Sequence, residues 1–527
     1  MIKRKRLCCL VAIAVFLGFA VRNHAHTQAR NPVIWADVPD VSVIRVGKTY
    51  YMSSTTMHMS PGIPIMKSKD LVNWQLVGYA YDTLQDDDAL NLRNGQNAYG
   101  KGSWASSLQY HDGTFYVSMF SLTTGRTHVY TTKDIEKSPW KGSSFKPLLY
   151  DHSLFFEDDG RVYMISGPGN IRLTELTADA SAVMPGGKSQ IIITNASLLA
   201  GPRISLPAEG LQFRKINGKY YLLSITWPKG GMRTELEFRS DTLTGPYEGR
   251  IFLQDKGVAQ GGLIDTPEGK WYAFLFRDYG AVGRVPYLVP VKWVDGWPVA
   301  GDDGKVPDTL DIPAGEGGVW GIVASDEFNR QPGQPALPLA WQWNHNPDNA
   351  HWSLTARPGW LRLTTGRVDT NFLGARNTLT QRTFGPECSG TIALDVSNMK
   401  NGDFAGFGVL QKKYGFVGVK MAGDTKSIVM VSAESTPGVE LENVPLNQKI
   451  VFLKVECDYK NQADKAEFYY SLDCKQWTTI GKPLKMSYTI PHFMGYRFAL
   501  FNYATETPGG SVDFDYFRVT GTITGAN

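Results

Sequence analysis

The stretch INGKYYLLSIT (216–226) is one of five segments that decide the fold, because each combines a glycine turn with a following strand rich in aromatic residues. The other four are RVGKTYYMSST (45–55), HDGTFYVSMFS (111–121), DDGRVYMISG (158–167) and PEGKWYAFLFR (267–277). A glycine turn between two apolar runs is typical of a β-hairpin. Five such hairpins indicate a repeated structural unit.

The repeat has a period that suits a propeller blade. Each segment carries one tyrosine in the same register, at positions 51, 116, 163, 221 and 272, so the spacings are 65, 47, 58 and 51 residues. A period near 50 with one hairpin in each unit is what a blade of four antiparallel strands requires. We therefore predict an all-β protein with a five-bladed β-propeller over residues 30–300. An irregular β-sandwich built from the same common hairpins is the alternative.

Five residues stand eleven or twelve positions before these tyrosines: Asp40, Trp104, Asp151, Glu209 and Gln260. If the blades are equivalent, all five side chains face the axial opening of the propeller. Three of the five are carboxylic acids. Carboxylates held close together repel one another and raise one another's pKa, so such a cluster predicts either a metal site or a chemical use.

Hydrolysis of a glycosidic bond is the chemical use that fits these acids. It needs one protonated carboxyl group to protonate the leaving oxygen and one carboxylate to activate water. Calcium binding by the three acids is an alternative, although the chain lacks a D-x-D-x-D loop. A second alternative is a propeller lectin whose acids only hold ligand hydroxyls.

Longer stretches around these acids carry a family resemblance. NPVIWADVPDVSVIRVGKTYYM (31–52), YDHSLFFEDDGRVYMI (150–165) and AEGLQFRKINGKYYLL (208–223) resemble glycoside hydrolase family 43, and the resemblance continues in order to about residue 300. That family comprises five-bladed propeller enzymes that act on β-xylosides and α-L-arabinofuranosides with inversion of configuration. A related retaining fructosidase family is less similar, because Arg277-Asp278-Tyr279 lacks the proline of its R-D-P motif.

The resemblance implies a role for each candidate residue. Asp40 is expected to be the general base, Glu209 the general acid, and Asp151 the residue that tunes the pKa of the acid. Trp104 and Arg284 are expected to bind substrate.

Gln260 completes the predicted substrate-binding set. It stands where many family members have histidine. This chain therefore lacks the ligand or hydrogen-bond partner that the histidine usually provides near the axis. The resemblance implies no cofactor for catalysis.

The first 29 residues are predicted to be a signal peptide, because four basic residues precede an apolar run that is short for a membrane span. The formal charge of +4 includes five basic residues from this segment, and the remainder of the chain carries −1. A near-neutral chain without basic runs predicts neither a nucleic-acid partner nor, after removal of the signal, a membrane. We expect a secreted or periplasmic enzyme that releases arabinofuranose from arabinoxylan or a related plant polysaccharide. β-Xylosidase activity is the alternative.

A second domain is predicted after a linker rich in glycine, proline and aspartate (301–324). Residues 325–527 show short alternating strands that predict a β-sandwich, and they resemble the concanavalin-like jelly roll that follows the propeller in xylosidase-type members of the family. This domain is expected to bind glycan, to cover the propeller pocket with a loop, or to stabilise the fold. Related sandwiches hold structural calcium near positions corresponding to Glu327 and Asp515. The three cysteines after the signal segment are an odd, sparse set and predict no disulfide framework, although Cys457 and Cys474 could pair.

Overall fold

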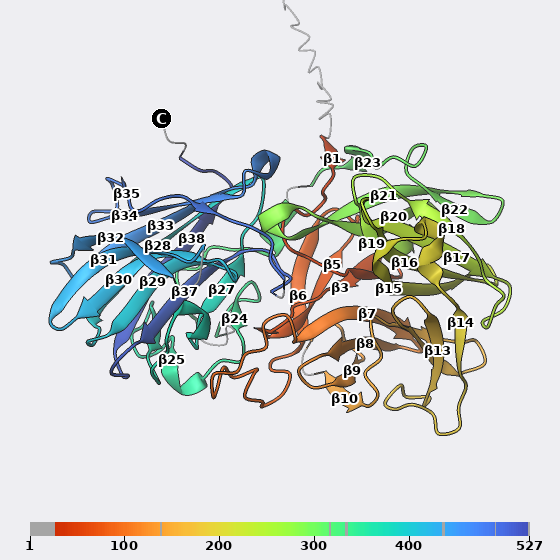
Figure 1. Ribbon diagram of the computed structural model, residues 1–527, viewed down its shortest axis with the longest axis horizontal. Coiled ribbons are helices and arrows are strands. Elements are labelled where there is room, and N and C mark those ends of the chain that lie inside the picture. Colours follow the sequence, from red (N-terminus) through yellow and green to blue (C-terminus); the bar gives the residue numbers. More distant parts are fainter. Residues whose placement is uncertain are drawn as a thin grey trace, which may run out of the picture.

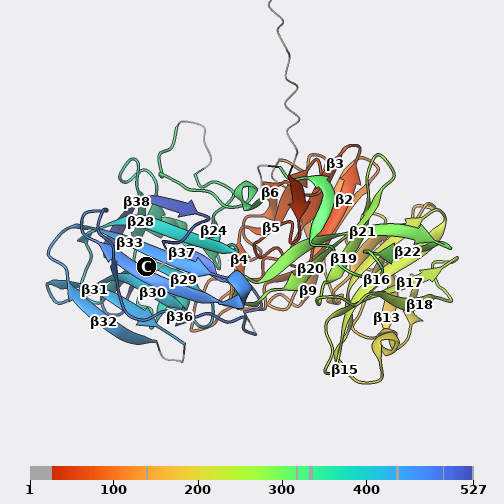
Figure 2. The ribbon, with the colours of Figure 1, turned by 90° about the horizontal axis from the view of Figure 1, so that it is seen from above.

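The computed structural model describes residues 27–137, 140–315, 318–331, 336–434, 438–490 and 492–524. A propeller, coloured red to green, lies beside a two-sheet sandwich, coloured teal to blue (Figures 1 and 2). The predicted all-β fold, with a five-bladed propeller followed by a β-sandwich, is confirmed. Residues 1–26 of the predicted signal peptide lie outside the described residues.

Five four-stranded antiparallel sheets form the blades. The first two blades contain β2 (Ser42–Val46), β3 (Thr49–Ser53), β5 (Gly62–Ser68) and β6 (Trp74–Tyr81), then β7 (Ser103–His111), β8 (Thr114–Ser121), β9 (Arg126–Thr132) and β10 (Lys141–Phe145). The third and fourth contain β11 (Ser153–Phe156), β12 (Val162–Ser166), β13 (Ile171–Leu176) and β14 (Ser189–Ile193), then β15 (Ile204–Ile216), β16 (Lys219–Pro228), β17 (Thr234–Ser240) and β18 (Glu248–Leu253). The fifth contains β19 (Ala259–Asp265), β20 (Trp271–Asp278), β21 (Arg284–Val294) and β22 (Trp297–Ala300). Each of the five register tyrosines lies on the second strand of its blade, as the repeat predicts.

The first strands of the blades form a closed inner ring, in which β2, β7, β11, β15 and β19 each neighbour the next and β19 returns to β2. Serine side chains link neighbouring members of this ring, because a hydroxyl on one strand accepts a hydrogen bond from a backbone amide of the next. The 3.0 Å pairs are Leu108 N to Ser42 Oγ, Leu154 N to Ser107 Oγ and Phe213 N to Ser153 Oγ. These bonds fix the inner strands relative to one another and thereby position the residues at the axial opening.

Aromatic side chains of the repeated hairpins fill the space between blades. Phe155 of the third blade packs edge-on against Phe213 of the fourth, with ring centroids 4.9 Å apart, and Phe213 stacks near Tyr220. All three side chains are buried. Large aromatic side chains remove much apolar area from water, so the aromatic signature of the repeat is a packing requirement.

The chain segments on either side of the blades meet at the junction of the first and last blades. Strand β1 (Gln28–Arg30) pairs with β23 (Thr309–Pro313), which lies in the predicted linker. The Asn31 side chain donates to the carbonyl of Leu288 on β21 and accepts from its amide. Ala29 of β1 is buried, so the last residues of the predicted signal segment belong to the folded domain.

Two eight-stranded arrays form the sandwich. One contains, in spatial order, β32 (Val439–Pro445), β31 (Thr425–Ser432), β30 (Gly415–Ala422), β29 (Asp403–Leu410), β37 (Arg497–Ala504), β27 (Leu379–Arg382), β24 (Gln342–Asn344) and β4 (Met59–Ser60). The other contains β25 (Trp352–Ser353), β26 (Leu361–Thr364), β38 (Ser511–Thr520), β28 (Glu387–Asn398), β33 (Ile450–Asp458), β34 (Lys465–Ser471) and β35 (Thr478–Thr479), with β36 (Leu484–Lys485) also on β34. The short 3₁₀ helices of the described residues are η1 (Ala196–Ala200), η2 (Gly280–Val282), η3 (Gly318–Gly321), η4 (Asn349–His351), η5 (Phe372–Gly374) and η6 (Lys460–Gln462). None of these helices is long and apolar enough to cross a membrane.

Strand β4 belongs to the first blade's connections, yet it extends a sheet of the sandwich by pairing with β24. Trp341 and Trp343, in and beside β24, are buried. The aromatic segment 341–352 therefore packs the core and joins the two domains.

The structure corrects the cysteine expectation. Cys457 on β33 lies opposite Cys388 on β28, and both side chains are buried. Cys474 lies elsewhere, with its sulfur 3.6 Å from the Tyr516 hydroxyl. All three are free thiols, so the possible pairing of Cys457 with Cys474 does not occur.

Candidate active site

Three of the predicted axial residues share an unusual backbone conformation. Asp40 (φ 52°) and Asp151 (φ 43°) stand just before the inner strands β2 and β11, and Gln260 (φ 58°) is the second residue of β19. This left-handed region favours glycine, and other residues persist there only where the surroundings hold them. The chain therefore turns sharply at these points, at the end of the inner ring where the acids gather.

Glu209 and Trp104 do not share this conformation, which corrects the simple equivalence that the repeat predicts. Glu209 lies inside the longer strand β15, and the left-handed residue is its neighbour Gly210 (φ 63°). A Cβ atom on Gly210 would lie 2.5 Å from the side chain of Gln260, so only glycine fits behind the acid. Trp104 sits in β7 at an irregularity between Ser103 and Ser106.

Asp40 is fixed by an arginine from the last blade. Nη1 of Arg284 donates to Oδ1 of Asp40 at 2.6 Å, and both side chains are almost fully buried. The amide of Arg284 also donates to Asp37, three residues before Asp40, at 2.8 Å. The second oxygen of Asp40, Oδ2, has no hydrogen-bond partner among the described residues. This oxygen is therefore the one that could accept a proton.

Asp151 and Glu209 are linked through Gly210, whose amide donates to Oδ2 of Asp151 at 3.0 Å. Burial raises the pKa of Asp151 well above its ordinary value, and the charges of Glu209 and Asp40 raise it further. The charges of the three acids therefore act on one another. Their catalytic roles stay predictions.

Glu209 is poised to hold a proton near neutral pH. Its carboxyl group is half-buried, and burial raises its pKa to about 7, with the charge of Asp40 adding to the shift. The Tyr150 hydroxyl, which donates to Oε2 of Glu209 at 3.1 Å, acts in the opposite direction. A carboxyl group with this pKa can donate a proton and take it back at neutral pH.

The sandwich supplies a wall of the site that the candidate residues did not include. Phe493 lies with its ring centroid 5.2 Å from that of Trp104 and 4.8 Å from the guanidinium of Arg284, which also donates to the Phe493 carbonyl. Neighbouring His492 stacks on Tyr99 of the propeller at 4.1 Å. A loop of the sandwich thus reaches the propeller beside Asp40, and the three expected roles of the sandwich stay predictions.

Gln260 is placed by a second buried carboxyl group. Oε2 of Glu235 accepts a hydrogen bond from the Gln260 amide at 2.7 Å, while Oε1 has no partner among the described residues. Burial raises the pKa of Glu235 well above its ordinary value. The Gln260 side chain packs on Gly210, so Gln260 supports the strand that carries the acid, and its contact with substrate stays a prediction.

The calcium expectation finds no support in the sandwich. Both oxygens of Glu327 accept from the guanidinium of Arg518, at 2.7 and 2.9 Å. Burial raises the pKa of the nearby Asp515, and the charge of Glu327 adds to this. Across the described ranges, no group of three or more His, Cys, Asp or Glu side chains is arranged to hold a metal ion. Calcium at Glu327 and Asp515 stays a prediction.

Comparison with known protein families matches both domains. The model for glycosyl hydrolases family 43 matches residues 29–298, and that for the beta-xylosidase C-terminal concanavalin A-like domain matches residues 325–520. The chain belongs to glycoside hydrolase family 43. The resemblance expected from the sequence is confirmed, and the protein is a glycosidase.

Individual family 43 proteins are similar over most of the chain. A beta-xylosidase of Formosa agariphila is 30% identical over 92% of this chain and 89% of its own length. A non-reducing end alpha-L-arabinofuranosidase of Bacteroides ovatus is 32% identical over 68% of this chain and 69% of its own. A structure described as a bifunctional GH43-CE protein of Bacteroides eggerthii is 60% identical, with a TM-score of 0.93 over 95% of this chain. The chain spans 64% of that larger protein.

Proposed function

We propose that this family 43 enzyme is an inverting, exo-acting α-L-arabinofuranosidase that releases arabinofuranose from arabinoxylan or a related plant polysaccharide. The observation that carries the proposal is the contrast between two neighbouring acids. Burial raises the pKa of Glu209 to about 7, whereas Asp40 is bound to a buried arginine and keeps one oxygen that no described residue contacts by a hydrogen bond. A proton donor and a proton acceptor are the two groups that single displacement requires.

In the proposed reaction, protonated Glu209 gives its proton to the glycosidic oxygen as the bond from this oxygen to the anomeric carbon breaks. Oδ2 of Asp40 takes a proton from a water molecule, whose oxygen forms the new bond at the anomeric carbon from the opposite face. The products are the free sugar and the shortened chain, with Asp40 protonated and Glu209 ionised until they exchange protons with solvent. Asp151 holds Gly210, and its charge state influences the pKa of Glu209. These steps use carboxyl groups and water and require no cofactor.

An exo action is supported by Phe493 of the sandwich, which lies against Trp104 and Arg284. A residue in this place leaves more room for a terminal or branch sugar than for the middle of a long chain. Arabinofuranose is a branch sugar of arabinoxylan, and the similar Bacteroides ovatus protein is named as an arabinofuranosidase. The Formosa agariphila protein is named as a beta-xylosidase, so a terminal xylose is the alternative to be tested.

A direct comparison of two aryl glycosides tests the sugar. We expect hydrolysis of aryl α-L-arabinofuranoside at a kcat/KM at least about tenfold above that of aryl β-D-xyloside, which corresponds to about 1.4 kcal/mol of discrimination. The variants Asp40→Ala and Glu209→Ala control for contaminating activity. A preference for the xyloside would replace the arabinofuranosidase assignment, and no turnover of either glycoside or of arabinoxylan would refute the hydrolase proposal.

We also propose that the protein is exported and acts on polysaccharide outside the cytoplasm. The support is the basic and apolar pattern of the first 29 residues. Mass spectrometry of the N-terminus after expression with an export pathway tests this. An intact N-terminus on protein retained in the cytoplasm would contradict it.

A further inference from the structure

The face of the fourth blade that carries Glu209 continues to the rim of the site. Glu209 on β15 lies directly opposite Ile225 on β16. Paired residues in a sheet project to the same side, and so do residues two apart on one strand. Trp227, two residues after Ile225, therefore projects from the same face as Glu209, further along the strand toward solvent.

Trp227 is an exposed aromatic residue with a fixed orientation. Its side chain is 39% exposed, and its indole Nε1 donates to the Gly231 carbonyl at 2.9 Å. The guanidinium of Arg233 lies 5.1 Å from the ring centroid. Arg233 in turn forms an ion pair with Asp278, at the end of β20 in the fifth blade. Contacts within the fourth blade thus fix the ring, and Arg233 connects it to the fifth blade.

Arg233 also connects this ring to the catalytic acid. Its positive charge acts on Glu209 and lowers the pKa of that acid, against the stronger effect of burial. Arg284, which contacts Phe493, binds Asp40. Trp227 and Arg233, in contrast, belong to the fourth blade, which also carries Glu209.

The side of Glu209 is the side of the leaving group, because the general acid protonates the oxygen that departs. A pyranose ring offers an apolar C–H face to an aromatic ring and hydroxyl groups to a guanidinium. We propose that Trp227 and Arg233 form a binding subsite for the leaving-group sugar, a xylopyranose residue of the polysaccharide backbone. This inference rests on the proposed function, since it assigns the other half of the bond that the enzyme cleaves.

The experiment compares two substrates that share the same arabinose. One is an aryl α-L-arabinofuranoside, which has no sugar in its leaving group, and the other is an arabinose-substituted xylo-oligosaccharide. In the variant Trp227→Ala we expect kcat/KM on the oligosaccharide to fall about 10-fold, near the upper end of the range for an aromatic contact, and that on the aryl glycoside to fall less than about 3-fold. Trp227→Phe should recover most of the activity on the oligosaccharide.

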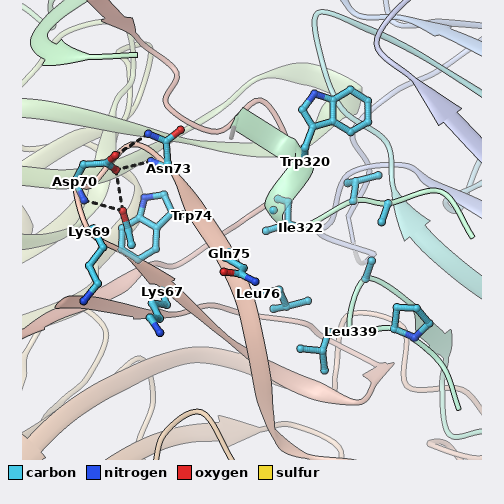
Figure 3. A pocket seen from close by; sticks show the side chains of 16 residues that line it. Lys67, Lys69, Asp70, Asn73, Trp74, Gln75, Leu76, Trp320, Ile322 and Leu339 are labelled. Atoms are coloured by element: carbon cyan, nitrogen blue, oxygen red, sulfur yellow. Dashed lines mark hydrogen bonds between the residues drawn. The ribbon is translucent and has the colours of Figure 1, made fainter. Parts of the chain in front are cut away.

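Trp320 provides the matched control. It is 49% exposed and lies on the 3₁₀ helix η3, at the rim of a groove of about 720 Å³ that β6 also lines (Figure 3). None of the three catalytic acids lines this groove. Trp320→Ala should leave kcat/KM unchanged on both substrates.

Two results would overturn the subsite. Equal losses of Trp227→Ala on both substrates would show that the ring acts through Glu209, and no loss on either would show that the ring does not contact the leaving group. Binding is a separate readout. Glu209→Gln should bind unsubstituted xylotetraose in calorimetry, and adding Trp227→Ala should weaken this binding about 10-fold. If the wild type cleaved neither substrate, the proposed function would fail, while the binding comparison would still decide whether the subsite exists.

Discussion

Arg284 on β21 and Asp40 before β2 form a buried ion pair, with Nη1 and Oδ1 2.6 Å apart, which joins the last blade of the propeller to the first. The same arginine donates through Nη2 to the carbonyl of Phe493 in the sandwich at 3.2 Å. One side chain therefore holds the proposed base, closes the ring of blades and anchors the sandwich loop that carries Phe493.

We predict that Arg284→Met lowers both stability and activity. Removing one partner of a buried pair leaves the other charge uncompensated, which costs about 3–5 kcal/mol. kcat/KM should fall at least about 100-fold because Asp40 loses its position. Denaturant unfolding and initial rates measure the two effects.

The double variant Asp40→Asn/Arg284→Met separates the effect on stability from the effect on activity. It should regain part of the lost stability, because the unpaired carboxylate is gone, but none of the activity. Full stability in Arg284→Met alone would show that the pair is not important for folding.

The pH dependence of kcat/KM should show an alkaline limb with an apparent pKa near 7. Glu209 must be protonated to act as the acid, and burial raises its pKa to about 7. Initial rates between pH 4 and 9 at constant ionic strength give the pH profile of kcat/KM. A rate that stayed constant up to pH 9 would be incompatible with Glu209 as the acid.

The stability of Glu209→Gln relative to wild type should also depend on pH. The ordinary pKa of 4.5 rises to about 7 on folding, so the native state binds this proton more tightly than the unfolded chain. The stability that this confers is fully present below pH 4.5 and is lost as pH rises through 7. Glutamine cannot ionise, so the variant should gain up to about 3 kcal/mol over wild type between pH 5 and pH 8. Urea unfolding at both pH values measures this gain, and a difference independent of pH would count against it.

The two proposed roles predict different responses to the leaving group. Glu209→Gln should lose about 10³-fold in kcat on a substrate with a poor leaving group and far less on a dinitrophenyl glycoside, which departs without protonation. Asp40→Asn should lose activity equally on both, because the water still needs a base. If the two variants behaved alike, the roles of acid and base would not be distinguishable in this way.

Much of the fold could be predicted because the hairpin repeat is local. A glycine turn and a register tyrosine such as Tyr221 specify a hairpin within about ten residues, and five copies specify five blades. The three acids could be predicted because each stands eleven or twelve positions before a register tyrosine. The expected equivalence of the axial positions failed at Glu209. Strand β15 is longer than the other inner strands, and a glycine takes the left-handed position there.

Other features depend on contacts between residues far apart in the chain. Phe493 lies more than 200 residues from Arg284, and no periodicity connects the sandwich loop to the propeller site. Glu235 looks like any strand glutamate until pairing places it beside Gln260. The pairing of Cys388 with Cys457 in register likewise depends on the order of the sandwich strands. The family resemblance allowed a covering loop, but the sequence offered no signal for the residues that make these three contacts.

The central claim is single displacement by Asp40 and Glu209, and the anomeric form of the first product tests it most directly. Proton NMR during the first minutes of hydrolysis of an α-L-arabinofuranoside should show β-L-arabinofuranose before mutarotation. Initial release of the α-anomer would mean retention of configuration and would contradict the roles assigned to both acids.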